Sequence, residues 1–230
     1  MTKLVLYYAP GTCARVSMIT LFEGGIDFEP RLIRFMAGQH RSPEYLAQNP
    51  KGKVPLLLAG DQKLSENVAI LWYLARTFPQ AQLLPLDGDP MRDAQVLSDL
   101  AWCASGLHPL VTRLRFPQFF CELPEARRSV WDIAAADMKR NFALLDARLQ
   151  DKPWLYGTWS ALDAYIYWVW FRVTGAGFDG SPFPNYAAHA RRMEERASVR
   201  RYLVLEAEAE AQLEKEGLLF RPPPPPSRED

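Results

Sequence analysis

The sequence predicts two kinds of architecture, an α/β domain followed by an all-helical domain. In the first third, short apolar runs with β propensity alternate with stretches of helical spacing, whereas beyond residue 90 only helical spacing recurs. Residues 79–89 contain two prolines and a glycine, a composition typical of a linker. We therefore expect domains at residues 1–78 and 90–216, followed by a proline-rich, disordered tail at 217–230.

The opening elements are a strand, a helix and a second strand. Leu4-Val5-Leu6 is the short apolar run of a strand. The helix of residues 13–23 has apolar residues at helical spacing and is followed by Gly24-Gly25, because glycine is the preferred residue just beyond a helix. A second strand is expected within residues 27–34, and a polar stretch then leads to a short helix near residues 43–48.

A loop, a hairpin and a helix complete the expected first domain. Asn49-Pro50-Lys51-Gly52-Lys53 has the composition of a turn. Residues 54–58 form a strand with Pro55 near its start, and Lys63-Leu64 forms the return strand. Ser65-Glu66-Asn67 then opens a helix. The order βαβ followed by ββα predicts a small domain with a mixed sheet.

Helices account for the second part. Asp89-Pro90 provides an N-cap followed by proline at the first helical position, and it opens a helix over residues 90–115 that bends near Gly106 and Pro109. Residues 160–163 have capping-box spacing, which predicts a structural cap for an aromatic helix. The remaining helices are expected over residues 130–149, from Ser160 through Phe171, from Pro184 onward and over residues 199–213.

Composition and charge exclude several classes of protein. The chain has 230 residues, 48% of them hydrophobic, with 27 basic and 27 acidic side chains, so nothing favours a broad nucleic-acid surface. No apolar stretch approaches a membrane span, and the first residues lack the pattern of a signal peptide. Cys13, Cys103 and Cys121 show no metal-ligand or CxxC spacing. We expect a cytoplasmic protein with free thiols and no metal site.

Cys13 carries the sharpest chemical signal. It follows Tyr7-Tyr8-Ala9-Pro10-Gly11, a strand end and a sharp turn, and Thr12 is the predicted N-cap of the next helix. Cys13 then falls in the first helical turn, where free N–H groups and the helix dipole favour an anion. We expect this thiol to ionise more readily than a free cysteine, and thiolates are the reactive form. A small buried core residue is the alternative interpretation.

Four segments together resemble the glutathione S-transferase family, most closely its bacterial cysteine-type branch, the beta class. They are Tyr8–Cys13, Asn49–Pro55, Leu64–Ile70 with Tyr73-Leu74, and Gly157 with Ser160–Tyr165. Each is weak alone, but their order and separations are specific and span nearly the whole chain. The resemblance implies a thioredoxin-like domain, a helical bundle, a homodimer, a role in detoxification, and glutathione as co-substrate with no resident cofactor.

The resemblance also implies a glutathione site in the first domain. Glu66 pairs with the γ-glutamyl ammonium, and Asn67 at a helix start holds the neighbouring carboxylate. Val54 offers a backbone edge to the cysteinyl unit, and Pro55 is cis in the family. Either Lys53 or Arg41 reaches the glycine carboxylate. The alternatives are structural: Glu66 complements a helix dipole, and Pro55 is an edge-strand proline.

Two further groups of residues follow from the resemblance. Cys13 and Tyr8 are the expected catalytic residues, with Tyr7 on the opposite face of the strand. The expected acceptor pocket contains His108, Arg115, Phe116 and Phe119. Exposure of His108 on a helix and loop packing of the phenylalanines are the alternative interpretations. The family's lysine after the second strand has no match at Met36-Ala37-Gly38, and its cleft asparagine and lysine correspond to Ala101 and Pro109, so the glutathione side is the better supported.

The predicted function is transfer of the glutathione sulfur to a small hydrophobic electrophile, with thiol–disulfide exchange through Cys13. The expected partners are glutathione, that electrophile and a second copy of the chain, but no nucleic acid and no membrane. Two alternatives stay open. One is a glutathione-binding scaffold without significant turnover, and the other is a glutathione-dependent reductase or dehalogenase.

Overall fold

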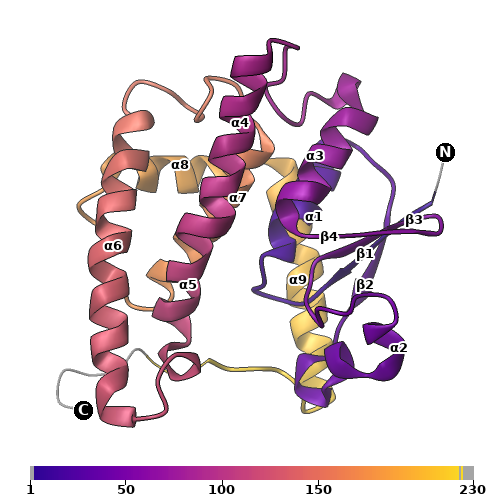
Figure 1. Ribbon diagram of the computed structural model, residues 1–230, viewed down its shortest axis with the longest axis vertical. Helices are drawn as coiled ribbons and strands as arrows, with labels where there is room; N and C mark the ends of the chain where they lie inside the picture. Colours follow the sequence, from indigo (N-terminus) through magenta and orange to yellow (C-terminus); the bar gives the residue numbers. More distant parts are fainter. Residues whose placement is uncertain (1–2, 223, 225–230) are drawn as a thin grey trace. The chain divides into compact units, whose positions relative to one another are not determined.

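The computed structural model describes residues 3–222 and 224 (Figure 1). By their packing, these residues form two compact units, the first made of residues 3–86 and 194–221 and the second of residues 87–193. Half of the predicted proline-rich tail, residues 223 and 225–230, lies outside the described residues. Within the described part of the chain, every helix falls short of the length or the apolar character that a membrane span requires.

In the described residues, the first unit is built on a four-stranded mixed sheet with the order β2-β1-β3-β4 (Figure 1). Its strands are β1 (Leu4–Tyr8), β2 (Glu29–Leu32), β3 (Leu56–Ala59) and β4 (Gln62–Ser65). β1 runs parallel to β2 and antiparallel to β3, so Leu6 lies between Pro30 and Leu57. Leu6 and Leu57 are fully buried, as expected for the central strands of a covered sheet. The α/β prediction for the first third is confirmed.

The helices of the first unit are α1 (Ala14–Glu23), α2 (Pro43–Leu46), α3 (Asn67–Thr77) and α9 (Ala197–Lys215). α1 packs against both α3 and α9 and is buried from Ala14 to Leu21. α9 buries a stripe at three- and four-residue spacing, formed by Tyr202, Glu206, Ala209 and Leu213. We expected α9 within the helical domain of residues 90–216, but this stripe faces α1 and groups α9 with the first unit. The domain boundaries otherwise stay a prediction.

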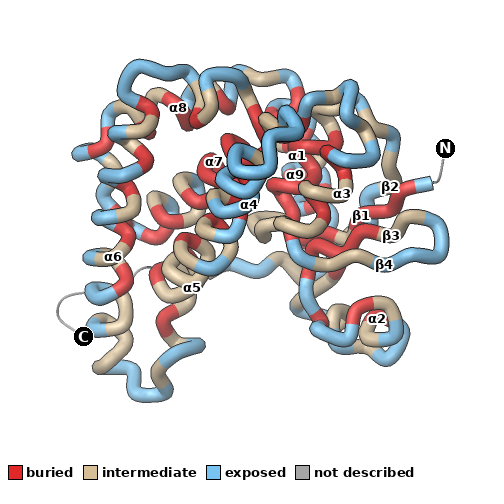
Figure 2. The backbone as a smooth tube through the Cα atoms, turned by 45° about the horizontal axis from the view of Figure 1, so that its top comes forward, coloured by how far each residue is buried: buried red, intermediate tan, exposed pale blue. Residues whose placement is uncertain are grey.

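The second unit is all-helical, as predicted. Its helices are α4 (Pro90–Trp102), α5 (His108–Arg115), α6 (Arg127–Arg148), α7 (Ala161–Thr174) and α8 (Pro184–Glu194). A π-helical turn, Cys103–Leu107, separates α4 from α5, and a Cβ on Gly106 would lie 2.7 Å from Cδ1 of Trp102, so this position requires glycine. Figure 2 shows α7 buried along most of its length, and the predicted capping box of Ser160 and Asp163 is present at its start.

Candidate functional site

Cys13 lies at the junction between the turn after β1 and the start of α1. It is the N-cap residue of α1, it is partly exposed, and its Sγ donates to the carbonyl oxygen of Val54 at 3.7 Å. The prediction that Thr12 is the N-cap is wrong, because the Thr12 hydroxyl donates to the Ala9 carbonyl at 2.6 Å. That bond closes the turn, in which Gly11 has a φ of 70°, and it leaves the N–H groups at the start of α1 without a side-chain cap.

The start of α3 is joined directly to this turn. The Asn67 side chain donates from Nδ2 to the Cys13 carbonyl at 2.9 Å and accepts from the Ser17 hydroxyl at 2.6 Å. Asn67 is only 5% exposed, and of its two contacts the one with Ser17 is buried and the one with Cys13 is partly buried. The structure therefore gives the Asn67 side chain a positioning role, whereas we expected it to contact a ligand carboxylate. No described side chain caps the first backbone N–H groups of α3.

Val54 and Pro55 are buried, and the peptide bond between them is cis. The Lys53 carbonyl just before them accepts from the Tyr45 hydroxyl and from Nδ2 of Asn49, both at 2.7 Å. Two buried donors thus fix the backbone that leads to Val54, while the Lys53 side chain is exposed. The Cys13 thiol contacts the Val54-Pro55 turn through its hydrogen bond to the Val54 carbonyl.

Glu66 has a backbone conformation that residues other than glycine rarely adopt, with φ 74° and ψ 125°. Such a conformation costs about 1–3 kcal/mol and is commonly found at functional sites. The Glu66 side chain is 63% exposed, and its Oε1 accepts from Nζ of Lys51 at 2.6 Å. The first unit thus brings Cys13, the Val54-Pro55 turn and the Glu66-Asn67 helix start together. The resemblance predicts that these five residues form the glutathione site, and we use that name for them.

Tyr8 and Tyr7 face opposite sides of the sheet, as the alternation of a strand requires. Tyr8 is 5% exposed, and burial together with the nearby carboxylates of Glu206 and Glu208 raises its pKa to about 12. The Tyr8 phenol therefore stays protonated at neutral pH and is available as a hydrogen-bond donor. The Tyr7 hydroxyl instead accepts from Nη1 of Arg31 at 3.0 Å.

The buried carboxylate of Glu206 on α9 accepts a hydrogen bond from the turn before Cys13, and sequence analysis did not predict it. Glu206 accepts from the Gly11 backbone N–H at 2.7 Å, from the Tyr202 hydroxyl at 2.5 Å and from Nη2 of Arg15 at 2.5 Å. The side chains of Arg15 and Glu206 are 1% and 8% exposed. In the sequence, the only indication of this contact was a charged residue among the buried residues of α1 and another among those of α9.

A cationic segment follows β2 in the short 3₁₀ helix Gln39–Arg41. Burial, and then the charges of Arg41 and Lys53, lower the pKa of His40. The loop holding Lys53 packs on this segment, because a Cβ on Gly52 would lie 3.0 Å from the His40 carbonyl oxygen. His40 was not predicted as a site residue, and its lowered pKa keeps the imidazole neutral at neutral pH, so Arg41 and Lys53 are the groups here that favour a carboxylate nearby.

The predicted acceptor residues lie in the second unit, at the two ends of α5. At its start, the His108 ring packs 4.6 Å from the Trp168 ring, and Nδ1 lies 3.5 Å from the Tyr165 hydroxyl, both on α7. At its end, Phe116 stacks on Phe119 with ring centroids 5.2 Å apart. Arg115, whose pKa burial lowers, donates to the Gly175 carbonyl. The structure brings Arg115, Phe116 and Phe119 together, and we call them the acceptor segment; His108 lies apart from it.

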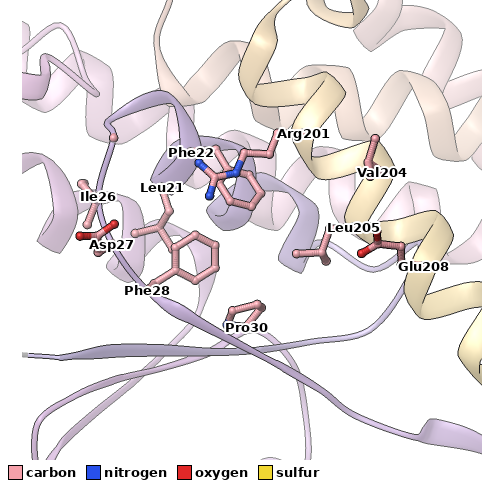
Figure 3. A pocket seen from close by; sticks show the side chains of 11 residues that line it. Leu21, Phe22, Ile26, Asp27, Phe28, Pro30, Arg201, Val204, Leu205 and Glu208 are labelled. Atoms are coloured by element: carbon pink, nitrogen blue, oxygen red, sulfur yellow. The ribbon is translucent and has the colours of Figure 1, made fainter.

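The first unit also has a cavity of about 320 Å³ that contains none of the predicted site residues (Figure 3). Its walls come from the end of α1, the approach to β2 and one side of α9. The guanidinium of Arg201 lies 4.4 Å from the centroid of the Phe22 ring at this cavity. Within the described residues, no group of His, Cys, Asp and Glu side chains is arranged to hold a metal ion.

A mixed sheet with a thiol at the start of α1 and a cis-proline turn beside it defines a thioredoxin-like domain, here followed by a helical unit. Residues 2–76 match the family model described as the glutathione S-transferase N-terminal domain. Glutathione S-transferase GstA of Escherichia coli O157:H7 is 32% identical over 202 residues, which cover 84% of this chain and 94% of GstA. The chain belongs to the glutathione S-transferase family.

Solved structures agree with this assignment. The bacterial beta class glutathione S-transferase of Sphingomonas chungbukensis is 30% identical, with a TM-score of 0.75 over 88% of this chain and 98% of that chain. A sphingomonad glutathione S-transferase complexed with glutathione is 29% identical, with a TM-score of 0.75 over the same shares of both chains. The predicted family and the thioredoxin-like fold are confirmed.

Proposed function

We propose that this chain is a glutathione transferase that joins the glutathione sulfur to a small apolar electrophile at the Cys13 turn. The observation that carries the proposal is that three separate segments meet at Cys13. Cys13 Sγ contacts the Val54 carbonyl at 3.7 Å, and Asn67 at the start of α3 donates to the Cys13 carbonyl at 2.9 Å. The glutathione complex of the sphingomonad relative supports this ligand.

Each end of glutathione has a chemically matched group in the glutathione site. Glu66 supplies a carboxylate for the γ-glutamyl ammonium, and the Val54 edge supplies backbone groups for the cysteinyl unit. Beside that site, Lys53 and Arg41 supply positive charge for the glycine carboxylate, and His40 stays neutral because burial and these two cations lower its pKa. This arrangement leaves the glutathione sulfur beside Cys13, at the start of α1.

The start of α1 stabilises negative charge on sulfur, because no described side chain caps it and the helix dipole is positive at this end. The protonated Tyr8 phenol adds a hydrogen-bond donor from the first unit. A glutathione thiolate held in one orientation attacks the electrophilic carbon, and the leaving group departs with the electron pair of the broken bond. The protein therefore contributes orientation and charge stabilisation, with glutathione itself as the nucleophile. Phe116 and Phe119 of the acceptor segment favour an apolar electrophile.

The partial exposure of Cys13 supports a second activity, thiol–disulfide exchange. The Cys13 thiolate attacks a glutathione-containing disulfide, forms a mixed disulfide with glutathione and expels the other thiolate. A second glutathione thiolate then attacks the mixed disulfide, which releases oxidised glutathione and restores Cys13. Every disulfide broken is matched by one formed, so no further oxidant or reductant is needed.

Replacement of Cys13 separates these activities. In Cys13→Ala and Cys13→Ser, we expect reduction of a glutathione mixed disulfide to fall to background, because no attacking sulfur remains. Conjugation of glutathione to 1-chloro-2,4-dinitrobenzene should fall less, since glutathione provides its own sulfur. Both activities unchanged in both variants would remove Cys13 from the site. Saturable glutathione binding without turnover by the wild type would instead select the scaffold alternative.

The homodimer and the cytoplasmic location remain part of the proposal. The side chains of Met91 and Leu97 on α4 are 69% and 41% exposed, which favours a covered surface there in an assembly. None of the three cysteines is in a disulfide, which favours a reducing compartment. Sedimentation equilibrium tests the dimer, and a mass equal to one chain at micromolar concentration would contradict it.

A further inference from the structure

We propose that Lys51 and Glu66 form a preassembled clamp for the zwitterionic α-amino acid end of the γ-glutamyl group, in which Lys51 binds the α-carboxylate. This inference rests on the proposed function, because it names a further binding residue of the same site. The clamp makes Lys51 a specificity-determining residue. Sequence analysis assigned recognition of the γ-glutamyl end only to Glu66 and Asn67 at the helix start.

The first observation is the ion pair itself. Nζ of Lys51 and Oε1 of Glu66 are 2.6 Å apart, and the side chains are 55% and 63% exposed. The pair therefore sits at the surface of the site, where a ligand reaches it without unfolding anything. Its hydrogen bond uses Oε1, and no hydrogen bond or ion pair of the described residues uses the other carboxylate oxygen, Oε2. That oxygen is available to a second cation.

The second observation is that both backbones are held firmly. Asn49 is 3% exposed, and its Oδ1 accepts from the Lys51 N–H at 3.2 Å while its carbonyl accepts from the Gly52 N–H at 2.9 Å. Glu66 is held in its left-handed conformation between β4 and α3. The backbone that carries each charged side chain is thus fixed, so less conformational entropy is lost when a ligand binds the pair.

The third observation is that the Asn67 side chain already makes two hydrogen bonds inside the protein. Its Oδ1 and Nδ2 serve Ser17 and Cys13 inside the protein, which leaves backbone N–H groups but no Asn67 amide for the ligand carboxylate. The nearest charge that an incoming carboxylate meets at Glu66 is the Lys51 ammonium. A carboxylate bound by a cation as well as by N–H groups is held more strongly than by N–H groups alone.

The geometry matches that of an amino acid. The ammonium and carboxylate of the γ-glutamyl end are attached to one carbon, so their charges are as close together as those of the Lys51–Glu66 pair. When the ligand lies against the pair with its own two charges reversed, positive and negative charges alternate around a square. The ligand ammonium meets Oε2 of Glu66, the ligand carboxylate meets Nζ of Lys51, and the protein's own ion pair stays intact.

The test compares three peptides by isothermal titration calorimetry. They are glutathione, 4-aminobutyryl-cysteinyl-glycine, which lacks the α-carboxylate, and glutaryl-cysteinyl-glycine, which lacks the ammonium. For Lys51→Met we expect about a tenfold loss of affinity for glutathione, the size of one charge-assisted hydrogen bond at a half-exposed site. The affinity for 4-aminobutyryl-cysteinyl-glycine should stay unchanged, because that peptide has nothing for Lys51 to bind.

Three further variants complete the design. Lys51→Arg should retain most of the glutathione affinity, and Glu66→Gln should weaken the peptides that carry an ammonium but not glutaryl-cysteinyl-glycine. Lys3→Met removes a comparable surface pair, Lys3–Glu29 at 2.7 Å, and should change none of the affinities. Circular dichroism melting confirms that each variant is folded.

The outcomes separate the clamp from the function on which it rests. If Lys51→Met binds glutathione as well as or better than the wild type, the clamp is wrong and Lys51 is a bystander or a competitor for Glu66. An equal loss for glutathione and 4-aminobutyryl-cysteinyl-glycine would show a merely structural effect and also overturn it. Wild-type protein that binds none of the peptides would overturn the proposed function itself, and the clamp with it.

Discussion

The glutathione site of the first unit and the acceptor segment of the second differ in how their side chains are held. Asn67 and Glu206, two buried residues on different helices, fix the Cys13 turn through hydrogen bonds. In the acceptor segment, Phe119 is 69% exposed and its described ring contact is with its close sequence neighbour Phe116. A site for one invariant ligand gains from rigid contacts between distant residues, whereas a segment with exposed aromatic side chains tolerates changes of ligand and of sequence.

The largest expected effect is in the buried contact that holds the Cys13 turn. Glu206→Ala should lower the free energy of unfolding by about 3–5 kcal/mol, because it removes the carboxylate from a buried ion pair and leaves the Arg15 charge in the interior. Urea denaturation measures this change. Glu214→Ala is the control, since it removes an exposed pair with Arg221 and should cost about 0–1 kcal/mol. Equal losses in the two variants would show that burial of the Glu206 network is energetically unimportant.

The next effect is at the start of α3. Asn67→Ala removes one buried and one partly buried hydrogen bond and should cost about 1–3 kcal/mol of unfolding free energy. Because the Cys13 turn loses its link to α3, KM for glutathione should also rise several-fold in the conjugation assay. An unfolding free energy and a KM both equal to those of the wild type would mean that the two regions do not differ in rigidity as proposed.

A smaller effect is expected in the acceptor segment. Phe119→Ala should change the free energy of unfolding by less than about 0.5 kcal/mol, because the side chain is mostly in water. KM for an apolar electrophile should rise while KM for glutathione stays constant, since only the acceptor loses contact area. Steady-state kinetics with each substrate varied in turn separates the two constants. A change in the glutathione constant alone would reverse the assignment of the two regions.

The smallest effect at neutral pH concerns Tyr8. Its pKa of about 12 in the folded protein lies above the ordinary value of 10, so the folded state keeps this proton longer than the unfolded state. The resulting stability is fully present below pH 10 and is lost as the pH rises from about 10 to about 12. In a spectrophotometric titration, the difference between the wild type and Tyr8→Phe should show one phenol that titrates near pH 12. A difference curve centred near pH 10 would contradict the buried placement of Tyr8.

The sequence by itself determined the local elements and much of the site. Strand, turn and helix signals placed Cys13 at the start of α1, and the repeated apolar spacing predicted the helices of the second unit. The order of short motifs was enough for the family. These features follow from neighbouring residues, since turn chemistry and periodicity act over a few positions.

Only the tertiary structure decided which polar groups meet. Thr12 closes a turn although its position suggests a cap, and Asn67 turns inward although its position suggests a ligand contact. Glu206 bonds Gly11 across 195 positions of the sequence, which also draws α9 into the first unit. A hydrogen bond depends on the distance and direction between two groups in space, and for residues far apart in the chain these are set by the packing of helices on the sheet.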